Sequence, residues 1–290
     1  MKLRLFKNVT ISILLVTYIF STGCMKLALR ATPSLFIKME ASFFEECDPI
    51  LAEKAFPSNL KLLEGLLKND PDNRDILNSL CKGFYGYSML FVEEADQRRA
   101  SMLYLRARDY GFSALKHKGD ALLSTKQKDI NSILHDISRD EFETFLWTTV
   151  AWISWINLNL DKPAALAQLN TAQACLDVIL KADPEFMYGL PCILKGITLA
   201  AIPPMFGGEP DESKKYFERA MEISNRNFFL AQYYCARYYS VRIQDRKLFD
   251  SLVSEILKGD FSVLKDVCLL NSVIKSKAQR LGEMGDELFI

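Results

Sequence analysis

The chain contains 290 residues, and its 36 lysines and arginines are balanced by 36 aspartates and glutamates. Residues 1–23 contain three of the basic residues and no acid, so 33 basic and 36 acidic residues follow them, a net charge near −3. This balance argues against a nucleic-acid partner, which would require clustered positive charge. Only 13 glycines and 10 prolines occur in the whole chain, and leucine, alanine and lysine are the most frequent residues, which favours helices over sheets.

The N-terminus has the three parts of a bacterial lipoprotein signal peptide. A basic opening precedes a mostly apolar run of 12 residues from Val9 to Phe20, and Ser21-Thr22-Gly23-Cys24 closes the segment. The run is too short for a membrane-spanning helix, which needs about 20 residues, but it suits a signal peptide. We therefore predict cleavage after residues 1–23, lipidation of Cys24, and one soluble domain over residues 24–290 that is tethered to a membrane. The alternative is an ordinary signal peptide in which Cys24 is incidental.

The rest of the chain predicts helix after helix, with turns marked by Asp-Pro, Gly-Gly or Asn. Asp70-Pro71 and Asp183-Pro184 each follow a predicted helix. A Lys-Gly pair comes at the same distance after each of them, at Lys82-Gly83 and Lys195-Gly196. Each stretch indicates a helix end, a new helix and a close-packing glycine inside it. The expected helices cover about residues 30–46, 57–69, 73–93, 96–117, 125–136, 139–160, 163–181, 185–200, 210–223, 226–241, 245–257 and 262–282.

These helix pairs resemble tetratricopeptide repeats, which recur about every 34 residues. Such repeats need small residues where two helices cross closely and aromatic residues in the wedge between neighbours. The spacing is irregular here, because the loop 202–210 lengthens one unit. The positions that fit the pattern are Leu80, Cys81, Phe84, Ser213, Phe217, Ala220, Tyr234, Cys235 and Tyr238.

Several segments together resemble the T-component (TatT) family of lipoproteins associated with TRAP transporters. The resemblance covers roughly residues 50–260. It implies an all-α fold in which irregular tetratricopeptide-like helix pairs form a compact solenoid with an internal pore or cavity. The segments that carry it are Lys61–Phe91, Arg99–Leu115, Trp147–Trp152, Ile202–Gly208 and Tyr216–Ser224.

The resemblance also implies a function in transport. In that family the partner is a periplasmic solute-binding protein, the P-component, which serves a membrane permease. We therefore expect a periplasm-facing, lipid-anchored accessory protein that docks this partner and passes an apolar or organic-acid ligand to it, without a cofactor. Ring-like assembly into a homo-oligomer is compatible with this architecture. The alternative is a scaffold lipoprotein for outer-membrane or cell-envelope assembly, because repeat grooves bind peptides and proteins in general.

Two of the predicted helices carry candidate ligand-binding side chains. Arg106 and Tyr110 lie four residues apart and share a helix face, which suits a carboxylate. They equally fit a solvated face with an internal ion pair. Trp152 and Trp155, together with Trp147, either line an apolar channel or fill the core between repeats.

The loop 202–210 carries the remaining candidates, Met205 and Phe206. Three prolines, Pro203, Pro204 and Pro210, restrict the backbone of this loop, which also contains two glycines. An apolar tip on a rigid loop suits a partner contact or the closure of a pore. A simple connector between paired helices explains the same residues.

The residues of catalysis and metal binding are poorly represented. His117 and His135 are the two histidines, and neither has the spacing of a metal site. No glycine-rich phosphate loop or nucleophile elbow occurs. We therefore predict no enzyme, no catalytic residue and no bound metal.

Six cysteines follow Cys24, and none of them forms a CxxC motif. Cys175 and Cys192 lie at equal distances from the turn at Asp183-Pro184, so an antiparallel hairpin would place them at the same height. A disulfide and a pair of buried free thiols are both compatible with this spacing, and the free thiols are favoured.

Overall fold

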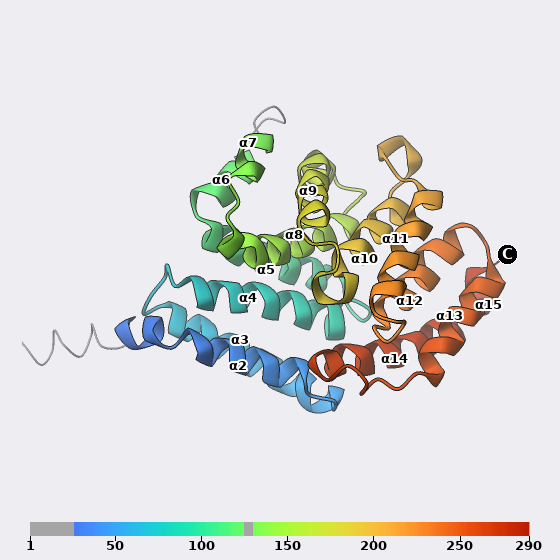
Figure 1. Ribbon diagram of the computed structural model, residues 1–290, viewed down its shortest axis with the longest axis horizontal. Helices are drawn as coiled ribbons and strands as arrows, with labels where there is room; N and C mark the ends of the chain where they lie inside the picture. The colour runs from blue at the N-terminus through green and yellow to red at the C-terminus, as the bar shows by residue number, and fades with distance from the viewer. Residues whose placement is uncertain (1–25, 125–129, 290) are drawn as a thin grey trace, which may run out of the picture.

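The computed structural model describes residues 26–124 and 130–289, and within these ranges every regular element is a helix (Figure 1). The predicted all-α class is therefore confirmed. Cys24 and the segment 1–23 lie outside the described residues. In chain order the α-helices are α2 (Pro33–Phe44), α3 (Pro49–Leu67), α4 (Arg74–Tyr87), α5 (Gln97–Leu115), α6 (His117–Ser124), α7 (Ile130–His135), α8 (Phe142–Asn157), α9 (Pro163–Ala182), α10 (Phe186–Ala201), α11 (Pro210–Ile223), α12 (Leu230–Tyr234), α13 (Arg246–Lys258), α14 (Cys268–Glu283) and α15 (Gly285–Leu288).

Shorter helical segments of other types interrupt or join these helices. Two are π-helical and were not predicted, η1 (Ser88–Val92) and η4 (Cys235–Ser240). Each continues an α-helix without a break, η1 after α4 and η4 after α12. The 3-10 segments are η2 (Arg139–Glu141), η3 (Pro204–Phe206) and η5 (Lys265–Val267).

Short polar side chains fix where several helices begin. Asp48 accepts hydrogen bonds from the first-turn N–H groups of α3, Asn73 does so for α4, and Asp96 for α5. The sequence predicted that the second helix starts at Pro57, but α3 begins at Pro49 and contains Pro57 in its interior. Asp48 followed by Pro49 is the stronger signal for a helix start. A proline at the first helical position costs little, because the N–H that it lacks would have no partner within the helix.

Several successive helices pack against one another, as α3 does with α4, α4 with α5, and α10 with α11, and α5 also packs against α8. Two of the glycines expected at close crossings lie at such contacts. A Cβ on Gly196 of α10 would lie 2.9 Å from the ring of Phe217, and one on Gly83 of α4 would lie 2.7 Å from Leu60. The close-packing role inferred from the repeated Lys-Gly pair is confirmed at both positions.

The C-terminal part of the chain returns to its first helices. Helix α14 contacts α2 and α3, so the red α14 lies beside the blue helices in Figure 1. A disulfide between Cys47, in the α2–α3 connection, and Cys268, the first residue of α14, joins them covalently. Cys175 and Cys192 are both buried free thiols, so the favoured prediction for this pair is confirmed.

Across residues 26–124 and 130–289, no helix combines the length and the apolar character that a bilayer span requires.

Candidate functional site

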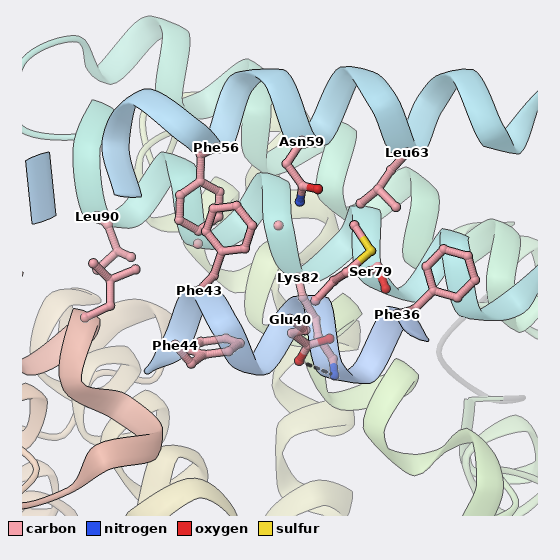
Figure 2. Close-up of a pocket in the computed structure, with 14 residues that line it drawn as sticks. Phe36, Glu40, Phe43, Phe44, Phe56, Asn59, Leu63, Ser79, Lys82 and Leu90 are labelled. Carbon is pink, nitrogen blue, oxygen red and sulfur yellow. Dashed lines mark hydrogen bonds and ion pairs between the residues drawn. The ribbon is translucent and has the colours of Figure 1, made fainter. Parts of the chain in front are cut away.

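An apolar pocket lies between α2, α3 and α4 (Figure 2). Its volume is about 50 Å³, and Leu90 of η1 and Leu269 of α14 are among the residues that line it. The rings of Phe43 and Phe56 face each other inside it, with centroids 4.6 Å apart. Its other lining residues are Phe36, Met39, Glu40, Phe44, Asn59, Leu63, Ser79, Lys82, Gly83 and Gly86.

Lys82 is the cation that lines this pocket, and two carboxylates neutralise its charge. The side chain of Lys82 is 8% exposed, and its Nζ lies 2.8 Å from Oε1 of Glu40 and also pairs with Glu143. Burial lowers the pKa of Lys82, but the two carboxylates outweigh it and hold the pKa above its ordinary value. Burial raises the pKa of Glu40. Because two carboxylates already surround the one cation, the pocket favours an apolar ligand over an anion.

A second, smaller cavity continues the first across α4 towards α8, α10 and α12. Trp147 lines it from α8. Gly86 lies where the two cavities adjoin, and a Cβ added there would meet no atom within 4 Å. The residues that line both cavities are Phe44, Lys82, Gly86 and Leu90.

A third cavity extends the series further. It shares Tyr85, Leu190 and Leu230 with the second cavity. Tyr238 lines both this third cavity and a large open pocket beside α14. Leu90 lines the large open pocket as well as the first and second cavities. The cavities therefore follow one another from the space under α2 to the face formed by η1, η4 and α14.

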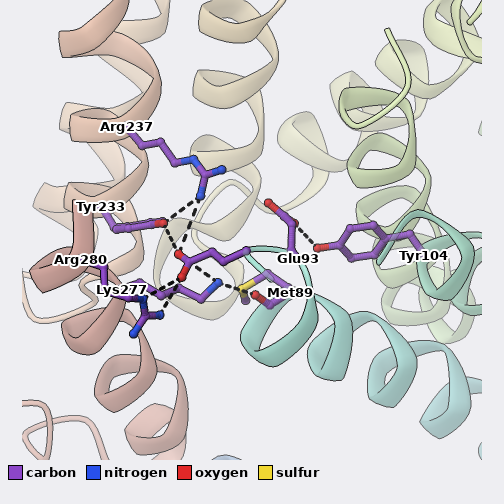
Figure 3. A network of polar contacts seen from close by, with 8 residues as sticks. Met89, Glu93, Tyr104, Tyr233, Arg237, Lys277 and Arg280 are labelled. Atoms are coloured by element: carbon purple, nitrogen blue, oxygen red, sulfur yellow. Dashed lines mark hydrogen bonds and ion pairs between the residues drawn. The ribbon is translucent and has the colours of Figure 1, made fainter. Parts of the chain in front are cut away.

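The large pocket beside α14, which we call the basic pocket, has a volume of about 710 Å³ and a charged centre (Figure 3). Arg237 of η4 and Lys277 and Arg280 of α14 converge on the carboxylate of Glu94. Arg280 donates from Nη2 at 2.7 Å and from Nε at 3.1 Å, whereas Lys277 Nζ lies 3.5 Å and Arg237 Nη1 4.0 Å from the carboxylate. The hydroxyl of Tyr233 donates to the same carboxylate at 2.9 Å.

The electrostatics of the basic pocket follow from this geometry. Burial alone would raise the pKa of Glu94, but Lys277, Arg280 and Tyr233 together hold it below its ordinary value. Burial lowers the pKa of Lys277, whose side chain is only 5% exposed, and Glu94 opposes that shift. Sequence reasoning missed this cluster, because more than 140 positions separate Glu94 from Arg237 and no local motif connects them.

The structure gives Arg106 and Tyr110 a carboxylate partner from the chain itself. Tyr110 donates its hydroxyl proton to Glu64 of α3 at 2.6 Å, and Arg106 forms an ion pair with the same carboxylate. The guanidinium of Arg106 also lies over the ring of Phe84, 4.5 Å from its centroid. The two side chains do share a helix face, and in this structure that face joins α5 to α3.

The tryptophans of α8 are core residues. Trp152 is 1% exposed and donates from Nε1 to Gln168 at 2.8 Å. Trp155 is also buried, with the guanidinium of Arg108 5.5 Å from its ring centroid. Neither lines any of the four cavities described above, whereas Trp147 does.

Met205 lies at the tip of the loop between α10 and α11 and is 82% exposed. It belongs to η3, which ends at Gly207 in the left-handed conformation with a φ of 93°. The backbone of Phe206 is part of η3, and its side chain lies outside the described part of the structure. Across the described chain, no three His, Cys, Asp or Glu side chains are arranged to hold a metal ion.

The sequence was compared with known proteins and families. A search of curated protein sequences found no match. The family model of the TRAP transporter T-component matches residues 45–289, which include every helix from α3 to α15 and all of the cavities except their α2 wall. The chain therefore belongs to the TRAP transporter T-component family.

Proposed function

We propose that this protein docks a periplasmic solute-binding protein and passes an apolar or organic-acid ligand between that partner and its own interior. Membership of the T-component family supports the transport role. The observation that carries the ligand passage is the series of adjoining cavities, which begins at the apolar pocket under α2 and ends at the basic pocket. Small side-chain movements at shared lining residues such as Leu90 and Tyr238 would connect them.

We further propose that the protein acts outside the cytoplasm as a lipoprotein. Residues 1–23 would be its signal peptide, Cys24 its lipid attachment point, and residues 24–290 a single domain. The Cys47–Cys268 disulfide supports export, because disulfides persist in oxidising compartments and are rare in the cytosol. A tetratricopeptide-like origin of the helix pairs is supported by the equivalent close-packing glycines, Gly83 and Gly196.

For docking, we propose the loop that presents Met205. A methionine that is 82% exposed on a short, proline-bounded loop provides an apolar contact with little conformational entropy to lose. Sedimentation velocity of the Cys24→Ser protein, residues 24–290, mixed with the solute-binding protein encoded nearest to it, tests this role. A complex that Met205→Asp weakens is the expected result. Independent sedimentation at tens of micromolar would contradict docking and favour the scaffold interpretation.

The ligand passage is tested at Gly86, where a larger side chain fills space without a clash. We expect Gly86→Leu to weaken binding of the neutral apolar fluorophore N-phenyl-1-naphthylamine by at least tenfold, because its side chain occupies the junction of the first two cavities. Gly65→Leu is the matched control, since Gly65 is an exposed helical glycine that also has no atom within 4 Å of an added Cβ. Equal affinities of the two variants would refute binding of apolar ligands in this series of cavities.

A further inference from the structure

The lining side chains of the basic pocket carry an excess of positive charge. Arg237, Lys277 and Arg280 line it, and among its described lining residues Glu94 is the one carboxylate. The neighbouring Glu93 points away from the pocket and binds the hydroxyl of Tyr104 (Figure 3). Three cations and one carboxylate give the lining residues a net charge of about +2. Glu93 lies close enough to raise the pKa of Arg237 and offsets part of this charge, and an anionic ligand would neutralise the rest.

The cations retain capacity to bind such an anion. The guanidinium of Arg237 has five N–H groups, and the one hydrogen bond that it donates within residues 26–124 and 130–289 goes to the hydroxyl of Tyr233, at 2.9 Å. Lys277 donates to the backbone carbonyl of Met89 at 2.8 Å, while its Nζ is 3.5 Å from Glu94. Arg280 is 55% exposed, so a ligand that enters from solvent reaches it directly.

The walls of the pocket are apolar. They bring together aliphatic and aromatic side chains from η1, η4, α14 and α15, and these surround the charged centre. A ligand that fits both parts has a carboxylate at one end and an apolar body. The apolar lining residues are Leu90, Phe91, Tyr238, Leu281, Met284 and Leu288.

The two π-helical segments of the described chain meet at this pocket. Segment η1 ends two residues before Glu94, and η4 contains Arg237. Single π-helical turns are rare in proteins and frequently occur at functional sites, because the extra residue redirects the side chains that follow it. Their convergence here is independent of the charge count and supports a binding role for the same pocket.

From these observations, we propose that the basic pocket binds the carboxylate of a small amphipathic organic acid, with Arg237 and Arg280 as the contacting cations. Glu94 occupies the position that the ligand carboxylate would take, so the two compete for the same cations. Binding to this chain alone follows from the pocket geometry; the transfer of such an acid to a solute-binding protein rests on the proposed function.

Isothermal titration of the Cys24→Ser protein, residues 24–290, with octanoate and with the neutral 1-octanol tests the assignment at constant ionic strength. We expect octanoate to bind at least tenfold more tightly than 1-octanol. Arg280→Gln and Arg237→Gln should each weaken octanoate binding by at least tenfold, and Glu94→Gln should strengthen it several-fold because the internal competitor is gone. Arg226→Gln is the matched control, because Arg226 is also half exposed and pairs with a carboxylate, Glu255, away from the pocket.

Because Arg280 is half exposed, Arg280→Gln should fold normally and tests the proposal even if Arg237→Gln impairs folding. The melting curve of each variant shows whether it is folded. Equal affinities for octanoate and 1-octanol, or octanoate binding that neither arginine variant changes, would overturn the proposal. If octanoate does not bind while Arg280→Gln abolishes co-sedimentation with the solute-binding protein, the pocket instead receives an acidic group of that protein. If the Cys24→Ser protein binds octanoate but does not co-sediment with the solute-binding protein, the docking function is contradicted and the proposed acid site is supported.

Discussion

The disulfide between Cys47 and Cys268 joins residues 221 positions apart and holds α2 over the apolar pocket. Phe43 and Phe44, shortly before Cys47, line that pocket from one side, and Leu269, directly after Cys268, lines it from the other. The bond therefore fixes the relative positions of two walls of the same cavity.

We expect the double variant Cys47→Ser/Cys268→Ser to lose about 2–5 kcal/mol of unfolding free energy, because the unfolded chain is no longer closed into a long loop. Urea denaturation measures the loss. Dithiothreitol should destabilise the unmodified protein by a similar amount and leave the double variant unchanged. In denaturant without reductant, the Cys24→Ser protein should show four reactive thiols, those of the free cysteines. Six reactive thiols would show that the disulfide does not form.

Lys82 stabilises the apolar pocket as well, because it neutralises the carboxylates of Glu40 and Glu143. We expect Lys82→Met to cost about 1–3 kcal/mol at neutral pH, less than for a fully buried pair because both carboxylates are partly exposed. Chemical denaturation measures this, with Lys215→Met as the control at an exposed pair that contributes little.

The pH dependence of the same variant gives an independent check. Without Lys82, the pKa of Glu40 rises further above its ordinary value, because burial then acts without its largest opposing charge. A group whose pKa is raised in the folded state lowers the free energy of unfolding when it is ionised. The difference in unfolding free energy between Lys82→Met and the unmodified protein should therefore shrink as the pH falls through the pKa of Glu40. A deficit that stays constant between pH 7 and pH 4 would contradict this account.

Gly196 allows α10 and α11 to approach closely, since a Cβ there would lie 2.9 Å from the ring of Phe217. We expect Gly196→Ala to be about 1–3 kcal/mol less stable than Gly65→Ala, because the fully buried ring has to shift. Both substitutions gain the same helix propensity of about 1 kcal/mol, so their difference reports packing alone. Thermal and urea unfolding of the two variants provide the comparison, and equal stabilities would refute the close crossing.

Asp70 holds the segment that leads towards the predicted anchor. Its buried carboxylate accepts from Arg30 at 2.6 Å and 2.9 Å and pairs with Lys26 at 3.1 Å. The hydrogen bond from Arg30 is the largest cause that lowers the pKa of Asp70 to about 2.

The sign of the resulting pH dependence follows from that depressed pKa. Folding lowers the pKa of the Asp70 carboxyl group from its ordinary value of 3.8 to about 2, so the ionised carboxylate stabilises the folded protein. This stabilisation is complete above pH 3.8, declines as the pH falls, and is lost below about pH 2. Urea denaturation between pH 6 and pH 2 should show this decline in the unmodified protein and a smaller one in Asp70→Asn. The same acid dependence in both proteins would show that Asp70 does not contribute to it.

The helical class and most helix positions could be predicted from the sequence because their signals are local. Periodic apolar residues, capping side chains and Asp-Pro turns act within one or two helical turns. Where a local signal misled, as Pro57 did, a stronger local signal at Asp48 and Pro49 determined the start of the helix. The family could also be identified from the order of several segments along the chain.

The partners of polar side chains required the tertiary structure. The helical spacing of Arg106 and Tyr110 correctly placed them on one face, but the carboxylate they bind comes from Glu64, more than 40 positions away. The pairing of Cys47 with Cys268, the convergence of three cations on Glu94, and the cavities between helices depend in the same way on which helices pack together. Packing is decided by shape complementarity over the whole core, and no window of sequence records it.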